Sequence, residues 1–265
     1  MKPRGYHAVI VAASFFSRAG FAFGFRWLHI VAGIMWIGLL YYFNFVQVPS
    51  FAAYGNDGDG PKARNIALNI LARKALWWFR WAAVATFLTG IVILGLTKSY
   101  FSGSGKGHNT AILTGMLLGT IMLLNVWGVI WRNQKIVLAN AANVLAGNAA
   151  DPNAAAAARK AGMASRQNTI FSVTMVWFMS FSAHFADSYL GGNGKLKNVA
   201  VYWIIALVII AVLELNALQL MPWKGTLNKG MNVIYDGKGV RNPLIAAFGL
   251  WAVFLFLWEV VLQNS

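Results

Sequence analysis

Six stretches of the chain are almost continuously apolar, and they are separated by segments rich in Lys, Arg, Gly, Ser and Asn. Each stretch approaches the roughly 20 residues that an α-helix needs to cross about 30 Å of hydrocarbon. The pattern therefore predicts an all-α integral membrane protein, built as a bundle of six transmembrane helices. The expected spans are residues 26–48, 77–97, 111–131, 169–186, 199–219 and 243–263.

The segment before the first span leaves the count open between six helices and seven. Residues 5–25 are apolar but contain Arg18 and several glycines. Residues 1–25 therefore form either an interfacial helix, which we favour, or an imperfect span. Residues 26–265 form one polytopic domain. Within it, the alanine-rich segment 132–168 contains Asp151 followed by Pro152, a helix-start signal, and predicts a helical hairpin outside the membrane.

Composition supports the membrane assignment. The chain is 58% apolar and only 11% charged, whereas about a quarter of the residues in soluble domains are charged. The formal net charge is +15, but the basic residues are spread over the loops. We therefore expect contacts with anionic lipid headgroups of the bilayer and no binding of nucleic acid. With no cysteine, the chain cannot form disulfides, iron–sulfur clusters or covalently attached haem c.

The loops at the two ends of the expected bundle differ in their content of Lys and Arg. Residues 49–76, 132–168 and 220–242 hold thirteen basic residues, and the segments at the other end hold seven. The positive-inside rule then places the richer loops and the 132–168 hairpin in the cytoplasm. The C-terminus would lie on the periplasmic side of a bacterial-type inner membrane.

Two histidines fall at matched depths in the first and fourth spans. His29 lies near the start of the first span and His184 near the end of the fourth, so antiparallel helices would bring both imidazoles close to the outer face. Ionisable side chains at membrane depth are costly, and a haem b whose iron is bound by both histidines would explain the pair. The alternative is that each is a hydrogen-bonded or interfacial residue.

Residues near the two histidines are compatible with such a cofactor. Gly33 and Trp36 lie four and seven positions after His29, and Ser180 lies four positions before His184, so they share helix faces with the imidazoles. A glycine there would let a porphyrin approach the backbone, and Arg26 could neutralise a propionate. Ordinary helix packing and interfacial snorkelling of the arginine are the competing explanations.

Two carboxylates also fall inside the expected spans. Glu259 lies towards the outer face, where it could accept a proton when a cofactor changes charge, and Glu214 lies towards the cytoplasmic side. Arg80, Asn44 and Asn125 occupy a depth similar to that of Glu214, which predicts a polar cluster inside the bundle. An ion pair between Arg80 and Glu214 is the structural alternative to a substrate site.

The stretch from Arg26 to Phe43, which contains His29, Gly33 and Trp36, resembles the first span of the membrane-bound urate hydroxylase family. Members of that family join a multi-helix membrane domain to a C-terminal cytochrome c. The resemblance implies a redox unit that oxidises a purine and passes electrons to cytochrome c. Because this chain has no cysteine, we expect the acceptor to be a separate cytochrome c or a partner subunit.

Two other interpretations remain open from the sequence. The spacing of Trp27, His29 and Trp36 is also similar to a span of the membrane protoporphyrinogen oxidase family, which would imply a different haem protein. The chain could instead be a cofactor-free structural or anchor subunit, whose histidines and glutamates only tie helices together. The sequence does not decide whether the chain is itself an oxidoreductase or a non-catalytic subunit of one.

Overall fold

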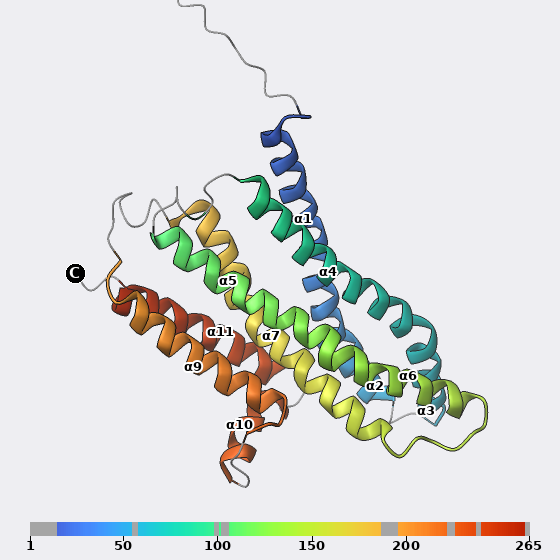
Figure 1. Cartoon of the computed structure of the whole chain (residues 1–265). Helices are drawn as coiled ribbons and strands as arrows, with labels where there is room; N and C mark the ends of the chain where they lie inside the picture. Colours follow the sequence, from blue (N-terminus) through green and yellow to red (C-terminus); the bar gives the residue numbers. More distant parts are fainter. Residues whose placement is uncertain are drawn as a thin grey trace, which may run out of the picture.

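In the described residues of the computed structural model, which are 15–54, 58–97, 101, 106–186, 196–221, 226–236 and 240–262, all regular structure is helical (Figure 1). Three long helices come first, and each contains a π-helical segment. They are α1 (Arg18–Tyr41), η1 (Tyr42–Gln47) and α2 (Val48–Tyr54); α3 (Gly60–Ala67), η2 (Leu68–Ala72) and α4 (Arg73–Leu96); and α5 (Lys106–Asn125), η3 (Val126–Ile130) and α6 (Trp131–Leu145). The others are α7 (Ala154–His184), α9 (Val199–Ala217), α10 (Thr226–Asp236), and α11 (Arg241–Phe256) with η4 (Leu257–Leu262).

Five of these helices are long and apolar enough to cross a membrane. They cover residues 18–54, 60–96, 107–145, 199–217 and 241–262, and they contain five of the six expected spans almost entirely. The prediction of a multi-pass helical membrane protein is therefore confirmed at this level. A bundle of six or seven spans is not confirmed, because the helix that contains the expected fourth span does not reach the same hydropathy.

That helix, α7, is 31 residues long and lies at the centre of the molecule. It contacts α5, α6, α9, α11 and the end of α1. Several of its polar side chains are fully buried, and they lower its hydropathy without facing lipid. They are Gln167, Asn168, Thr169, Ser172 and Thr174. A helix surrounded by other helices does not need an apolar outer surface. Mean hydropathy alone therefore does not decide whether α7 crosses the membrane.

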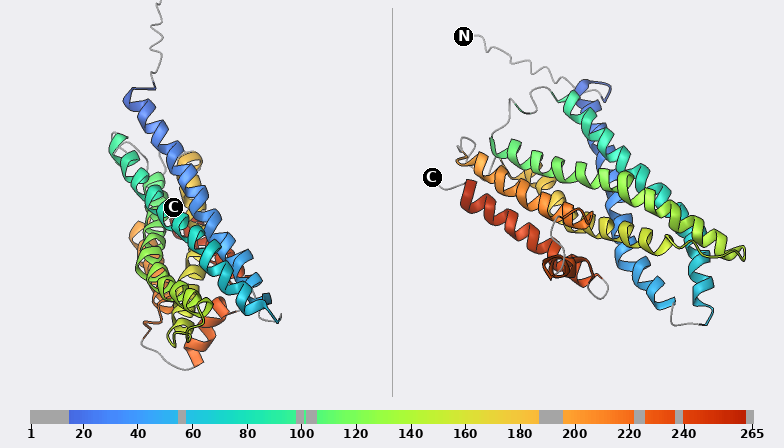
Figure 2. Two further views of the ribbon diagram at one scale, coloured as in Figure 1. Left: turned by 90° about the vertical axis from the view of Figure 1, so that its right-hand side faces the viewer. Right: turned by 60° about the horizontal axis from the view of Figure 1, so that its bottom comes forward.

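The helices separate into two groups towards one end of the molecule. α1 packs along α4, and α1 meets α7 only near its own C-terminal end, where Tyr41 Oη lies 2.9 Å from Ser172 Oγ and the Asn44 amide donates to Ser165 Oγ at 2.9 Å. From this contact, the α1–α4 pair diverges from α5 and α7 towards the end where α1 begins (Figures 1 and 2). The core of the other group is aromatic, and α7, α9, α11 and η4 supply Phe178, Phe181, Tyr202, Phe254 and Trp258.

The first described helix begins at Arg18, before the start of the expected span at residue 26, so residues 18–25 are continuous with that span. Residues 1–14 of the expected N-terminal segment lie outside the described part of the chain, and α1 begins at Arg18 because the Ser17 hydroxyl accepts a hydrogen bond from the amide of Gly20 at 3.1 Å. Arg18 donates to the carbonyls of Leu96 and Gly95 at 2.7 and 3.1 Å. These are carbonyls of the last turn of α4, so Arg18 caps that helix.

The segments that connect the helices lie at two ends of the molecule. α2, α3, the turn after α6 and α10 lie at one end, at the bottom of Figure 1, and we call this the basic end. The start of α5 and the end of α11 lie at the other. In the alanine-rich segment, α6 ends at Leu145, Gly147 adopts a positive φ of 81°, and α7 begins at Ala154, which forms a hairpin of two helices.

Candidate functional site

His29 is held in one orientation by α4. Its ring is half-buried, and Nδ1 lies 2.7 Å from the carbonyl oxygen of Thr86 and 3.3 Å from the hydroxyl of Thr89. A carbonyl oxygen only accepts hydrogen bonds, so Nδ1 carries the proton and Nε2 keeps its lone pair. Metal-binding histidines show the same arrangement, with the other ring nitrogen donating to a carbonyl or carboxylate.

Two glycines shape the surroundings of this imidazole. A Cβ at Gly90 of α4 would lie only 3.3 Å from Cε1 and 3.5 Å from Nδ1 of His29, so the ring rests directly on the helix backbone. A Cβ at Gly33 would lie 3.8 Å from the Thr86 methyl group, an ordinary contact. Gly33 therefore faces α4, and it is Gly90 that provides the space for the ring.

His184 has different surroundings from His29. His29 lies twelve residues before Tyr41, and His184 lies twelve residues after Ser172, the residue that Tyr41 contacts. Each histidine is therefore about 18 Å from that contact along its own helix, but α1 and α7 diverge in this direction (Figure 1). His184 in the last turn of α7 is exposed, and so is Ser180 on the same helix. On α1, Arg26 is exposed, whereas Trp36 is 3% exposed.

His108 is a histidine whose environment the sequence did not indicate. It is half-buried in the first turn of α5. Its Nδ1 lies 2.9 Å from the carbonyl oxygen of Ser182 on α7, which again assigns the proton to Nδ1. Its position three residues before the apolar run at residue 111 was the available signal. Among the described residues, no group of three or more His, Asp or Glu side chains gathers to hold a metal ion.

A buried polar network connects α5, α7 and α9. The Asn125 amide donates to Asn168 Oδ1 at 3.0 Å and to Glu214 Oε2 at 3.2 Å, and the Asn168 amide donates to the Met122 carbonyl at 2.9 Å. Asn125 and Asn168 are buried, and Glu214 is half-buried. The structure thus brings together two residues of the expected polar cluster, Asn125 and Glu214, and adds Asn168.

Asn44, which was also expected in the cluster, is bonded to Ser165 instead. Glu259, expected towards the outer face, is half-buried in η4 near the opposite end of the bundle. Beside the network, the buried hydroxyl of Tyr235 on α10 donates to Gln167 Oε1 at 2.5 Å and to the Leu213 carbonyl at 3.1 Å. Burial, together with the charge of Glu214, raises the pKa of Tyr235 above its usual value, so its phenol stays protonated and remains a donor.

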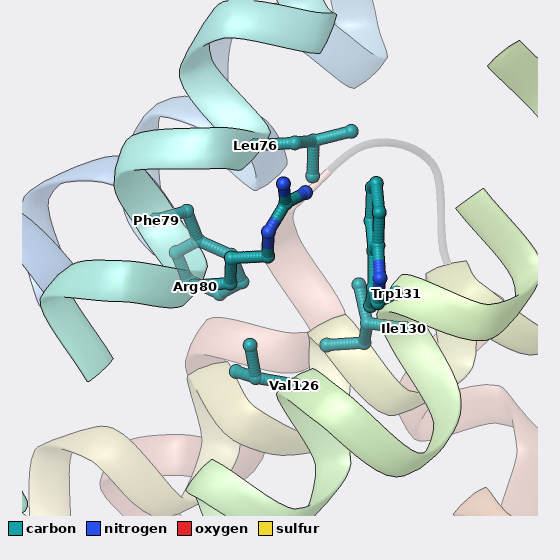
Figure 3. A pocket seen from close by; sticks show the side chains of 6 residues that line it. All are labelled: Leu76, Phe79, Arg80, Val126, Ile130 and Trp131. Atoms are coloured by element: carbon teal, nitrogen blue, oxygen red, sulfur yellow. The ribbon is translucent and has the colours of Figure 1, made fainter. Parts of the chain in front are cut away.

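Arg80 does not pair with Glu214. Its guanidinium carbon lies 3.6 Å from the centre of the Trp131 ring and 6.0 Å from that of Trp127. Arg80 and Trp131 lie between α4 and the η3–α6 segment among the apolar side chains of Leu76, Phe79, Val126 and Ile130, and the gap that they leave has no room for a water molecule (Figure 3). The ion pair allowed by the sequence is therefore replaced by a cation–π contact among apolar side chains.

The comparisons with known proteins give a relationship for part of this structure. Residues 96–223 match the family described as "Urate oxidase N-terminal". No curated protein and no solved structure matches the chain. The matched segment covers just under half of the chain and contains α5, α6, α7 and α9, and with them the whole network of Asn125, Asn168 and Glu214. The stretch from Arg26 to Phe43, which first suggested this relationship, lies outside it. Over residues 96–223, the chain is therefore similar to the urate oxidase N-terminal family.

Proposed function

We propose that this protein is a membrane redox subunit of a urate-oxidase-related system and that His29 binds the iron of a haem b. The observation that carries the proposal is the hydrogen bond from His29 Nδ1 to the Thr86 carbonyl, 2.7 Å long. It presents Nε2 as a ligand from inside one of the helices that can cross a membrane. When bound, the haem would supply reversible one-electron chemistry.

His184 is the second iron ligand in this proposal. Both histidines lie twelve residues along their helices from the Tyr41–Ser172 contact, on the same side of it. Because α1 and α7 diverge in that direction, this assignment requires the two helices to approach each other when the haem binds. Both lie away from the basic end, which by the positive-inside rule faces the cytoplasm, so the haem would lie near the periplasmic face. Exposed Arg26, three residues before His29, is then available to a propionate, and Trp36 packs in the core beneath the site.

The electron acceptor in this scheme is a separate cytochrome c or a partner subunit. The described chain offers no thiolate for a second haem of the covalent type, because the sequence contains no cysteine. Anionic lipids would contact the basic end, where Lys and Arg are concentrated.

Reduction of the haem by urate tests the whole proposal. Purified protein from haem-sufficient cells, oxidised and kept anaerobic, is mixed with urate while the visible absorbance is recorded. We expect b-type bands of the reduced haem to appear at a rate that increases with urate concentration. A haem that dithionite reduces but urate does not would contradict the urate relationship and leave an electron carrier. Protein without haem would support a cofactor-free anchor subunit.

Two glycine variants test the orientation of His29. In Gly90→Ala, the new methyl group would lie 3.3 Å from the imidazole, and backbone on one side and ring on the other leave it little room. We expect the haem content of purified Gly90→Ala to fall by more than about half, because a ligand displaced by a fraction of an ångström binds its metal less well. Gly33→Ala is the matched control, since its methyl group meets Thr86 at 3.8 Å. Equal haem content in the two variants would show that contact with Gly90 does not position the ligand.

A further inference from the structure

We infer that an aromatic and basic surface around Arg80 binds the headgroup of one anionic phospholipid. This surface, which we call the Arg80 surface, is formed by α4 and the neighbouring η3–α6 segment. Its residues are Trp77, Trp78, Arg80, Trp81, Trp127, Trp131 and Lys135. The inference assigns a site to the lipid contact proposed above. It rests on the proposed function only for the membrane location of the basic end, and it does not depend on the haem.

The Arg80 surface lies at the level where two expected spans end. The second span begins at Trp77 and the third ends at Trp131, and because the two helices are antiparallel, both limits face the basic end. Trp77, Trp78 and Trp81 are 45%, 53% and 45% exposed. Indole rings concentrate at the level of lipid headgroups, since one edge is polar and the rest of the ring is apolar. These exposed rings therefore mark the boundary of the bilayer.

Arg80 provides a positive charge at this level that no described side chain neutralises. The half-buried guanidinium has neither a hydrogen-bond acceptor nor a carboxylate partner among the described residues, and its carbon lies 3.6 Å from the centre of the Trp131 ring (Figure 3). The gap beneath it is closed to water, so an anion can meet the guanidinium only at its exposed side. A guanidinium stays charged at physiological pH and pairs with two oxygens of one phosphate.

The chain around this surface contains no competing acidic side chain. Residues 60–150, which include α3 to α6, hold no Asp and no Glu. Lys135 places its ammonium nitrogen 5.9 Å from the Trp131 ring, so a second cation reaches the indole on which Arg80 stacks. The basic residues of this range that belong to the basic end are Lys62, Arg64, Arg73, Lys74, Arg80, Arg132 and Lys135. Cations without acidic neighbours attract anions, and at the membrane boundary the abundant anions are lipid headgroups.

The same helix faces continue into the membrane as exposed apolar side chains. Leu88 lies seven residues beyond Trp81 and is 54% exposed, and Leu124 lies seven residues before Trp131 and is 63% exposed. A separation of seven residues returns to nearly the same face of an α-helix. A ligand that meets Arg80 with a phosphate can therefore lay acyl chains along these faces. This combination favours a phospholipid over an acidic segment of a protein, which has no acyl chains.

Native mass spectrometry of the full chain in detergent, titrated with phosphatidylglycerol or phosphatidylcholine, tests the inference. We expect the first phosphatidylglycerol to bind more tightly than the first phosphatidylcholine. Arg80→Gln should weaken the binding of phosphatidylglycerol by roughly tenfold, because charge-assisted hydrogen bonds to the phosphate are lost, and it should affect phosphatidylcholine less. Arg80→Lys should weaken the binding of phosphatidylglycerol by a smaller factor, since the charge remains while the fork is lost.

Arg73→Gln is the matched control. Arg73 lies on the same helix, but its guanidinium already donates to the side chain and carbonyl of Asn69, so we expect a change of less than about twofold. Equal weakening in Arg73→Gln and Arg80→Gln would overturn the inference, because it would indicate a diffuse attraction without a site. Binding of phosphatidylglycerol that Arg80→Gln leaves unchanged would also overturn it.

Two further measurements separate the lipid from other anions and from the haem. Excess inorganic phosphate should not displace phosphatidylglycerol, since phosphate has no acyl chains. Displacement would overturn the inference, and so would Arg80-dependent binding of a polyglutamate peptide in place of the lipid, which would indicate an acidic protein partner. In His29→Ala we expect unchanged binding of phosphatidylglycerol, so the haem proposal and this inference can fail separately.

Discussion

Purified His29→Ala is expected to contain no haem b, while its helical content and its yield in the membrane stay close to those of the unmodified protein. Nε2 of His29 is the ligand that the Thr86 carbonyl orients, and alanine offers no replacement. The half-buried ring lies between α1 and α4, and alanine is a good helix former, so we expect its removal to be tolerated. Haem content by pyridine haemochrome, relative to protein, is the measurement.

Two further histidine variants decide the second ligand. We expect His184→Ala to lose haem as His29→Ala does, and His108→Ala to retain it. His108 is the matched control, because its Nδ1 is also bonded to a backbone carbonyl of a neighbouring helix. Haem loss in His108→Ala combined with full retention in His184→Ala would reverse the assignment. Full haem content in His29→Ala would refute the role of α1.

Asn125→Leu should destabilise the bundle more than any other single change in the polar network. The Asn125 amide is the donor to both Asn168 and Glu214. Leucine would leave a buried amide oxygen and a half-buried carboxylate without that donor, and each unsatisfied group costs about 1–3 kcal/mol. Single hydrogen bonds between membrane helices average only about 0.6 kcal/mol, so we expect a loss of roughly 2 kcal/mol in the free energy of unfolding, measured by reversible denaturation in detergent.

Asn133→Leu provides the comparison for this measurement. The Asn133 amide bonds only to the carbonyl of Val129 on its own helix, and its removal leaves no other side chain without a partner. A loss below about 0.5 kcal/mol is expected. Equal losses in Asn125→Leu and Asn133→Leu would mean that the link between α5, α7 and α9 contributes no more to stability than a hydrogen bond within one helix.

The apolar pattern predicted the helices well because the membrane imposes a strict length on each span. Five expected spans fall within helices that can cross a bilayer. The pattern did not predict the place of α7, since hydropathy measures how apolar a helix is and not what surrounds it. Residues such as Asn168 and Ser172 lower the hydropathy of α7, yet they are fully buried against other helices. Only the packing shows that this helix is central.

The candidate site was predictable in its residue types and not in its pairings. His29, Glu214 and Arg80 attracted notice because ionisable groups are rare at membrane depth. Their partners depend on how each helix is rotated about its own axis. Similar depths along two helices do not define that rotation. Arg80 and Glu214 were expected at similar depths, but one stacks on Trp131 and the other accepts from Asn125.

Other parts of the site are set by backbone atoms, which carry no sequence signal. The donation from His29 to the Thr86 carbonyl and the contact of its ring with Gly90 are of this kind. The π-helical segments, including η3 next to Trp131, are likewise invisible in the apolar pattern. The sequence could therefore suggest a histidine ligand but not the proton on its Nδ1.

A reduced-minus-oxidised absorbance spectrum of the purified, unmodified protein decides whether this chain is a haem-bearing redox subunit. The protein is prepared from cells supplied with excess haem precursor and is reduced with dithionite. The proposal predicts reducible b-type bands at about one haem per chain, since two histidines ligate one iron. A spectrum without such bands, from folded protein, would contradict it and leave the helices and the polar network as parts of a subunit without haem.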